Sequence, residues 1–169
     1  MSSENLNRLR AKELVSLLPG VHLRALQRLL DASFNTTRYH VYNLERDGEI
    51  ICTKEGGHSR LYPAGLEEGS RSLYSALNSR SSRRVLTALL KSDGMATNDI
   101  SALSGLPKST ASEHLETLCQ LGLVRRTPLL GGGSSYEVQD RVRVGEALAL
   151  FERNLLALAA DSFIDLWGF

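Results

Sequence analysis

The sequence predicts a mainly helical α+β protein in which one small unit, made of three helices and a β-hairpin, occurs twice. The first observation is an internal repeat, because sliding the chain by 74 residues without a gap places His40 on His114 and Gly48 on Gly122. The second is a glycine-containing turn between two short β-prone segments after each third helix. The third is a long amphipathic segment that follows the second copy. A repeat of this length indicates that one supersecondary unit is used twice.

The helices of the first copy are predicted from apolar residues at helical spacing. Their expected ranges are 6–18, 22–32 and 36–47. A Pro-Gly pair ends the first helix, whereas Asn35 is the expected N-cap of the third helix and Gly48 closes it. Segments 49–54 and 60–63 flank a turn that contains a Gly-Gly pair, so they predict a hairpin.

The second copy repeats this order of elements. Its expected helices are 81–94, 97–106 and 107–122, and its expected hairpin strands lie in 123–130 and 136–140. Between the copies, Leu73, Tyr74 and Leu77 predict a short linking helix. The expected domain organisation is a first unit in 1–65, a linking helix in 66–80, a second unit in 81–140 and a C-terminal helix in 141–169.

The composition bounds the class of protein. With 42% hydrophobic and 23% charged residues the chain can bury a core, and its formal net charge is only +1. It contains no run of about 18 apolar residues and its first residues form no apolar signal region, so we expect a cytoplasmic protein without a membrane partner. The two cysteines are expected to be reduced. We find no spacing typical of a metal site, cofactor site or catalytic group, and therefore predict a protein that is not an enzyme and needs no cofactor.

The third helix and hairpin of each copy carry a resemblance to a known fold. The segment STASEHLETLCQLGLVRR in the second copy resembles the ArsR and MarR regulator superfamily, and this likeness covers about residues 81–139. The whole chain is similar to the tandem winged helix-turn-helix regulators common in archaea. The resemblance implies two tandem winged helix-turn-helix domains and a sequence-specific transcription regulator that binds double-stranded DNA.

The residues expected to contact DNA lie on the outward faces of the third helices and on the hairpins. A major groove about 12 Å wide admits one helix, in which Arg reads guanine, Asn reads adenine and hydroxyl groups hold phosphate. In the first copy the candidates are Thr36, Arg38, Tyr39, Tyr42, Asn43 and Arg46 on the helix, with Lys54, His58 and Arg60 on the hairpin. In the second copy they are Lys108, Ser109, Thr110, Ser112, Arg125 and Arg126.

The second copy is the weaker candidate for DNA contact. Glu113 and Glu116 share the outward face of its third helix, and carboxylates facing a polyanion are unfavourable unless one accepts from a cytosine amine. The matched histidines, His40 and His114, have two readings. They either donate to phosphate in a pH-sensitive way or pack the third helix against the second, and we favour packing.

The C-terminal segment has more apolar surface than a terminal helix needs. Its stripe is expected to form a dimer interface through Leu148, Phe151, Leu155, Leu158 and Phe163. In the ArsR-like pattern a C-terminal helix commonly builds the dimer, so we expect a homodimer. The alternative function is a winged-helix scaffold that binds other proteins in a transcription, chromosome or membrane-remodelling complex, which the low net charge favours.

Overall fold

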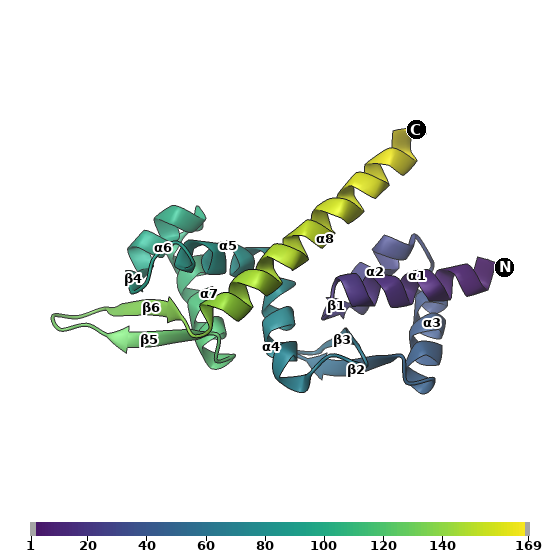
Figure 1. Cartoon of the computed structure of the whole chain (residues 1–169), viewed down its shortest axis with the longest axis horizontal. Helices are drawn as coiled ribbons and strands as arrows, with labels where there is room; N and C mark the ends of the chain where they lie inside the picture. Colours follow the sequence, from purple (N-terminus) through teal and green to yellow (C-terminus); the bar gives the residue numbers. More distant parts are fainter. Residues whose placement is uncertain (1–2, 168–169) are drawn as a thin grey trace. The chain divides into compact units, whose positions relative to one another are not determined.

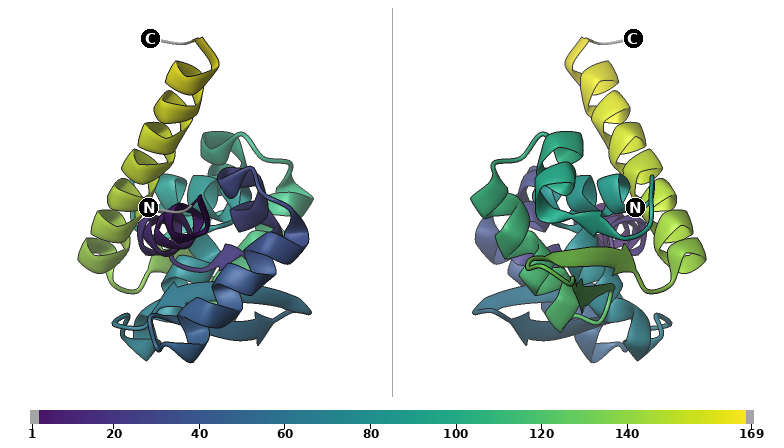
Figure 2. Two further views of the ribbon diagram at one scale, coloured as in Figure 1. Left: turned by 90° about the vertical axis from the view of Figure 1, so that its right-hand side faces the viewer. Right: turned by 90° about the vertical axis from the view of Figure 1, so that its left-hand side faces the viewer.

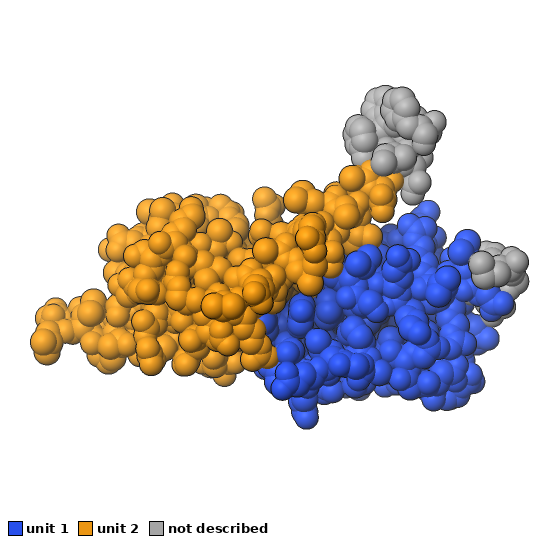
Figure 3. Space-filling view, in the orientation of Figure 1, with its two compact units in different colours: residues 1–75 blue, residues 76–169 orange. Residues whose placement is uncertain are grey.

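Figure 1 shows the chain as a computed structural model, which describes residues 3–167 and the side chains of residues 5–161. The chain divides into two compact units, residues 1–75 and 76–169, which Figure 3 distinguishes by colour. The division falls inside helix α4 (Glu68–Leu77), in the region where a short linking helix was expected. The domain boundaries at 65, 80 and 140 stay a prediction.

The first unit contains three helices and a three-stranded antiparallel sheet. Its elements are α1 (Ser3–Leu17), β1 (Val21–His22), α2 (Leu23–Leu30), α3 (Phe34–Arg46), β2 (Ile50–Glu55) and β3 (His58–Pro63). The strand order is β1-β3-β2, so the predicted hairpin carries an additional strand at its edge. Sequence reasoning misses β1, because a strand of two residues is too short to show a period-2 pattern.

The second unit has the same order of elements. They are α5 (Arg80–Leu89), β4 (Met95–Ala96), α6 (Thr97–Ser104), α7 (Lys108–Gln120), β5 (Val124–Pro128), β6 (Ser134–Val138) and the long helix α8 (Arg141–Trp167). Its strand order is β4-β6-β5. Helices α6 and α7 begin and end 74 residues after α2 and α3. The predicted α+β fold class, helices with small antiparallel hairpins, is confirmed.

The two hairpins differ by one residue in the turn, and this corrects the ungapped match of Tyr62 with Tyr136. In the first sheet Tyr62 pairs with Ile51. In the second sheet Tyr136 pairs with Arg126, whereas the position that corresponds to Tyr62 is taken by Glu137 opposite Arg125. Because neighbouring residues of a strand point to opposite faces, this one-residue difference places the two tyrosines on different faces of their sheets.

The third helix of the first unit begins one residue earlier than Asn35, so the predicted N-cap is wrong. The N-cap is Ser33, whose hydroxyl oxygen accepts a hydrogen bond from the backbone N–H of Thr36 at 3.1 Å. The Ser33 carbonyl also accepts from the hydroxyl of Thr37 at 3.0 Å. Both serine and asparagine are good N-caps, and only the backbone path of the preceding turn decides between them.

The core of each unit lies between its helices and one face of its sheet. In the first unit the buried side chains include Leu14, Leu26, Leu44 and Leu61, and in the second they include Leu86, Ile100, Leu115 and Leu118. In α3 the buried positions are Thr37, His40, Val41 and Leu44. Because these positions occupy one stripe of the helix, the opposite stripe of α3 faces away from the core.

Helix α4 covers the other face of the first sheet through a polar cluster around Glu55. One Glu55 carboxylate oxygen accepts from the hydroxyls of Thr53 and Tyr62, both at 3.0 Å, and the other accepts from the Ser75 hydroxyl at 2.9 Å. The Tyr62 ring is fully buried, and the Arg71 guanidinium lies 6.0 Å from its centre. Burial, followed by the hydrogen bond to the Glu55 carboxylate, raises the pKa of Tyr62 above its ordinary value.

Replacing Tyr62 with phenylalanine is expected to lower the free energy of unfolding by about 1.5 kcal/mol, because a hydrogen bond to a charged acceptor is lost while the ring still fills its site. Urea unfolding followed by circular dichroism measures this change. The matched control is Tyr39→Phe, since the Tyr39 side chain is exposed and has no hydroxyl partner of this kind to lose. An equal loss of stability in both variants would contradict the role given to Glu55.

The first half of α8 packs on α5 within the second unit. Arg141 donates to the backbone carbonyls of Leu89 at 3.1 Å and Leu90 at 2.5 Å, which are carbonyls at the end of α5. Phe151 is 2% exposed, and the Arg83 guanidinium lies 5.6 Å from its ring centre. The later turns of α8 extend beyond α5, α6 and α7 of the same unit (Figure 1).

Candidate nucleic-acid interface

The outward face of α3 carries the exposed side chains that the sequence singles out. The left view of Figure 2 looks onto the first unit, with α3 running across its front. Arg38 is exposed, and the exposed fractions of Tyr39 and Tyr42 are 53% and 63%. Large aromatic side chains this exposed are unusual on the surface of a helix that only supports a core. These three side chains form one stripe, because positions 38, 39 and 42 are three to four residues apart.

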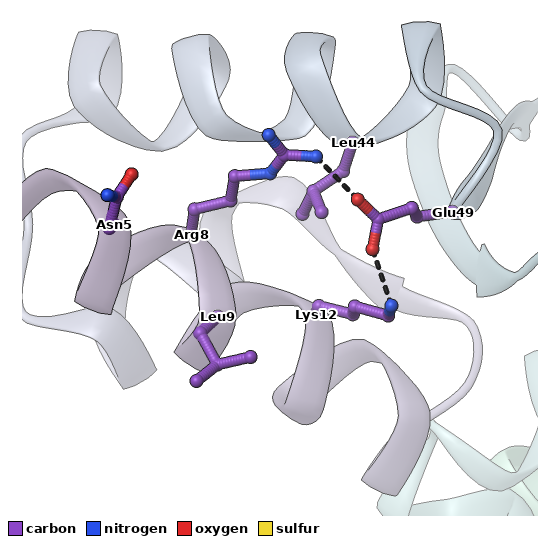
Figure 4. Close-up of a pocket in the computed structure, with 6 residues that line it drawn as sticks. All are labelled: Asn5, Arg8, Leu9, Lys12, Leu44 and Glu49. Atoms are coloured by element: carbon purple, nitrogen blue, oxygen red, sulfur yellow. Dashed lines mark hydrogen bonds and ion pairs between the residues drawn. The ribbon is translucent and has the colours of Figure 1, made fainter. Parts of the chain in front are cut away.

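Helix α1 holds the C-terminal end of α3 in place through a group of ion pairs. Figure 4 shows a pocket of about 330 Å³ in which Arg8 and Lys12 of α1 both meet the Glu49 carboxylate at 2.5 Å. Arg8 also reaches Asp47 at 2.7 Å. Lys12 and Arg8 lower the pKa of Glu49, so this carboxylate keeps its charge. The contacts tie α1 to the turn that follows α3 and so orient the exposed stripe.

Arg46 at the end of α3 is exposed but has a counter-ion in the chain. Its guanidinium lies 3.0 Å from the Asp47 carboxylate, which holds the pKa of Asp47 below its usual value. A DNA phosphate would have to compete with Asp47 for Arg46. Arg38 differs, because none of the ion pairs among the described residues involves it.

Two further predicted contacts on α3 are used partly inside the unit. Thr36 is half-buried, and its hydroxyl lies 2.8 Å from that of Ser33 in the N-cap network. Asn43 is also half-buried, and its backbone carbonyl accepts from the Asp47 N–H at 3.0 Å. The side chain of Asn43 lies at the edge of the exposed stripe. Both residues stay predictions as DNA contacts.

The hairpin of the first unit offers Lys54 and His58, whereas Arg60 points inward. Lys54 and His58 are exposed on either side of the turn. Arg60 is only 16% exposed, donates to the Gly20 carbonyl at 3.0 Å and lies 3.2 Å from the Glu55 carboxylate. These contacts correct the expectation that Arg60 reaches phosphate, because its guanidinium is already engaged by a carbonyl and a carboxylate.

The outward face of α7 in the second unit is less basic. Lys108, Ser109 and Ser112 are exposed and Thr110 is half-buried. Glu113 and Glu116 are exposed on the same helix, and the Gln120 amide donates to Glu116 at 3.2 Å. The two carboxylates therefore outnumber the single lysine on this face.

The hairpin of the second unit has a neutralised base and an apolar tip. Arg125 forms an ion pair with Glu137 directly across the sheet. Arg126 donates from its Nε to the Ser134 hydroxyl at 2.8 Å. At the tip, Leu130 is fully exposed, and Leu129 is 47% exposed. Arg126 is thus the more available of the two predicted arginines.

The matched histidines are placed differently from each other. His40 is 1% exposed, and its Nε2 atom is buried without a hydrogen-bond partner. His114 is half-buried, and its Nδ1 atom lies 3.0 Å from the Ser82 hydroxyl on α5. Neither position presents an open imidazole on the outward stripe, so the geometry supports the packing interpretation over a phosphate contact.

Part of the predicted dimer interface is used inside the chain. Leu148 and Phe151 are buried, which corrects the expectation that they contact a partner subunit. Leu155 and Leu158 are half-buried, and Phe163 lies outside the residues whose side chains are described. In contrast, Leu156 on the same helix is 72% exposed. The apolar stripe therefore divides into a part that covers α5 and a part with more exposed leucines.

Sequence reasoning misses a second basic surface on the first unit, formed by Arg24 and Arg28. Both are exposed on α2, and the Arg24 guanidinium lies 4.8 Å from the centre of the Phe34 ring at the start of α3. The available signal was the spacing of two arginines by one helical turn in a segment predicted to be amphipathic.

Two classes of site find no support in the part of the chain that the structure describes. Its His, Cys, Asp and Glu side chains form no group of three that could hold a metal ion. Its helices are all too short or too polar to cross a membrane.

A comparison with protein families matches residues 83–128 to the IclR helix-turn-helix domain. This segment covers most of α5, the helices α6 and α7, and strand β5. The match supports a winged helix-turn-helix of the kind found in DNA-binding regulators. It falls on the second unit, whose outward helix face is the less basic of the two. A comparison with curated proteins gives no match.

Several solved structures resemble the chain at low similarity. A MarR family transcriptional regulator from Silicibacter pomeroyi is 25% identical, with a TM-score of 0.40, and the match covers 57% of this chain and 64% of that one. A second MarR family regulator is 20% identical, with a TM-score of 0.42 and coverage of 60% and 65%. A possible transcriptional regulator from Methanosarcina mazei Go1 is 15% identical, with a TM-score of 0.35 and coverage of 70% and 97%. The chain thus spans less than two thirds of the first two structures, and the low TM-scores carry no argument about its function.

Proposed function

We propose that the chain is a DNA-binding transcription regulator whose first winged helix makes the main contact with the duplex. The observation that carries the proposal is the stripe of Arg38, Tyr39 and Tyr42 on α3, which is exposed and lies on the face of the helix away from the core. The match of the second unit to the IclR helix-turn-helix domain supports the same function.

In this proposal α3 enters the major groove with its exposed stripe toward the base edges. A guanidinium can bind guanine through two hydrogen bonds, and the tyrosine hydroxyls can bind phosphate or base edges. Lys54 and His58 on the hairpin then contact the backbone beside the groove, as a second, sequence-independent set of contacts. Arg46 adds to this surface only when DNA displaces its contact with Asp47.

We also propose that the regulator acts as a homodimer through the later turns of α8. Leu155, Leu156 and Leu158 lie beyond the part of α8 that covers α5, and Leu156 is largely exposed. One copy of the α3 surface has few phosphate contacts, and two copies related by a twofold axis double them. Recognition helices in such dimers bind half-sites about 34 Å apart, so the expected operator is palindromic.

A specific feature of the second unit favours a second candidate function, that of a scaffold for another protein. Its outward helix carries Glu113 and Glu116, and the tip of its hairpin exposes Leu129 and Leu130. An apolar tip beside an acidic helix suits a protein surface better than a phosphate backbone. Under this alternative the second unit binds a protein while the first unit binds DNA or a second protein.

Binding to duplex DNA is expected to weaken steeply as salt rises, because each neutralised phosphate releases counterions. Fragments selected from random DNA by the full chain supply the operator, and fluorescence anisotropy at several salt concentrations measures the affinity. For about four phosphate contacts, the slope of log affinity against log salt is expected to be about −4. Failure to enrich any sequence, or an affinity that does not change with salt, would refute the regulator and leave the scaffold.

A further inference from the structure

A second pocket lies in the first unit, between α2, the first residue of α3 and the turn of the hairpin. Its volume is about 320 Å³, within the range of small-molecule sites. Arg24 and Arg28 line it from α2, Phe34 from α3, and His58 and Ser59 from the hairpin. No acidic side chain is among the described residues that line it.

The pocket gathers positive charge without a counter-ion. Arg24 and Arg28 lie one turn apart on α2, and both are exposed. Arg24 and Arg38 approach the Phe34 ring at 4.8 Å and 6.0 Å. None of the described ion pairs involves these three arginines. Guanidinium groups that converge without a carboxylate are typical of sites that bind phosphate or carboxylate groups.

The hairpin side of the pocket adds two imidazoles. The rings of His22 and His58 lie 5.3 Å apart in an edge-to-face arrangement, and the Nδ1 atom of His22 is buried without a hydrogen-bond partner. Burial lowers the pKa of His22, and the positive groups Arg60 and His58 lower it further. His22 is also the N-cap of α2 but gives no side-chain hydrogen bond to the helix. The first N–H groups of α2 therefore have no side-chain cap at the edge of the pocket.

The second unit shows that the fold itself does not require these side chains. Its helix α6 corresponds to α2 and begins and ends 74 residues later. The equivalents of His22, Arg24, Arg28 and Phe34 are Ala96, Asn98, Ala102 and Lys108. The same backbone is therefore built without the two arginines, the histidine and the aromatic ring, so their presence in the first unit needs another reason.

We propose that this pocket binds the phosphate group of an anionic ligand, with Arg24 and Arg28 as the charged contacts and Phe34 beside the organic part of the molecule. The pocket is larger than a phosphate group alone requires, which favours a phosphate with an attached apolar or aromatic body. The same chemistry has two sources, a free phosphorylated small molecule and the backbone of bound DNA. The first source does not depend on the proposed function of the chain.

The test is a titration of the full chain without DNA, followed by NMR of the histidine and arginine side chains at constant ionic strength. Inorganic phosphate and phenyl phosphate are the probes. Saturable shifts of His22 and His58 are expected, with phenyl phosphate binding about tenfold more tightly because its ring can pack on Phe34. Phe34→Leu should reduce this preference while leaving the affinity for inorganic phosphate within about twofold.

Arg28→Ala is expected to weaken the binding of both probes by about tenfold, as for a lost charge-assisted hydrogen bond. The matched control is Arg10→Ala, which removes the same charge from an exposed position on α1 and should leave the affinity unchanged. Both arginines are exposed, so both variants should fold, and circular dichroism verifies this. Equal weakening in the two variants, or shifts that do not saturate, would overturn the proposal.

A second arm separates the two sources of phosphate. Adding the selected duplex to the chain loaded with phenyl phosphate displaces the probe if the DNA backbone occupies the pocket, and leaves it bound if the site serves a free ligand. Both results support a phosphate site. If no DNA sequence is selected at all, the proposed function fails while the titration of the small probes still decides the fate of the pocket.

Discussion

Replacing Arg38 and Tyr42 together with alanine is expected to weaken binding to the selected operator by about 100-fold, which corresponds to about 3 kcal/mol. Both side chains are exposed on α3, and the change removes no buried contact, so the fold should remain intact. A single good contact between Arg and a base is worth about 1–3 kcal/mol, and the tyrosine adds a phosphate or base contact. Anisotropy with the operator and with a scrambled duplex measures the loss.

The comparison with a scrambled duplex is essential to this prediction. A base contact discriminates between sequences, so the double variant should lose more affinity for the operator than for the scrambled DNA. Lys54→Ala should instead weaken both duplexes alike and reduce the salt slope by about 1. Arg10→Ala again controls for net charge. Unchanged operator binding in the double variant would move the DNA contact away from α3.

Replacing Phe151 with alanine is expected to lower the free energy of unfolding by about 3–5 kcal/mol. Its ring is buried in the second unit and lies beneath the Arg83 guanidinium, so truncation leaves a cavity and an arginine without its aromatic partner. The matched control is Leu156→Ala on the same helix, because that side chain is 72% exposed and its truncation should cost less than about 0.5 kcal/mol. Urea unfolding followed by circular dichroism measures both.

The same pair of variants separates folding from self-association. If Phe151 acts inside its own chain, the loss of stability should be the same at low and high protein concentration. Leu156→Ala should instead weaken dimerisation, measured by analytical ultracentrifugation, while leaving the unfolding of the dilute protein almost unchanged. A strong concentration dependence for Phe151→Ala would place that ring in a subunit interface.

Periodicity predicts the helices of this chain well. Thr37, Val41 and Leu44 were expected on the inner face of α3, and all three are buried. The reason is that a helix places residues three and four apart on one face whatever the helix packs against. The exposed stripe with Arg38 and Tyr42 follows from the same geometry, so the sequence already identifies the outward face of α3.

The hairpins and the arginines are harder to predict because they depend on partners across the sheet. The number of residues in the Gly-Gly-Gly turn sets the register of the second hairpin, and the sequence match alone aligns Tyr136 with the wrong residue. Arg60 and Arg125 look like free cations in the sequence. Glu55 and Glu137, each on a neighbouring or paired strand position, engage them in the structure.

The C-terminal helix shows the same division. Its apolar stripe is visible in the sequence, since Leu148, Phe151 and Leu155 recur at helical spacing. Burial of apolar surface has no preferred partner, because the hydrophobic effect is non-directional. The sequence therefore leaves open whether α5 or another subunit covers the stripe, and the structure assigns Leu148 and Phe151 to the interior of the chain.

From the sequence by itself come the repeated unit, the inward and outward faces of its helices, and the exposed arginine and tyrosines of α3, because these follow from local spacing. Only the tertiary structure decides which arginines remain available and where they gather. Charge pairing depends on residues far apart in the chain, such as Arg8 with Glu49, and the pocket between Arg28, Phe34 and His58 exists only once α2, α3 and the hairpin meet.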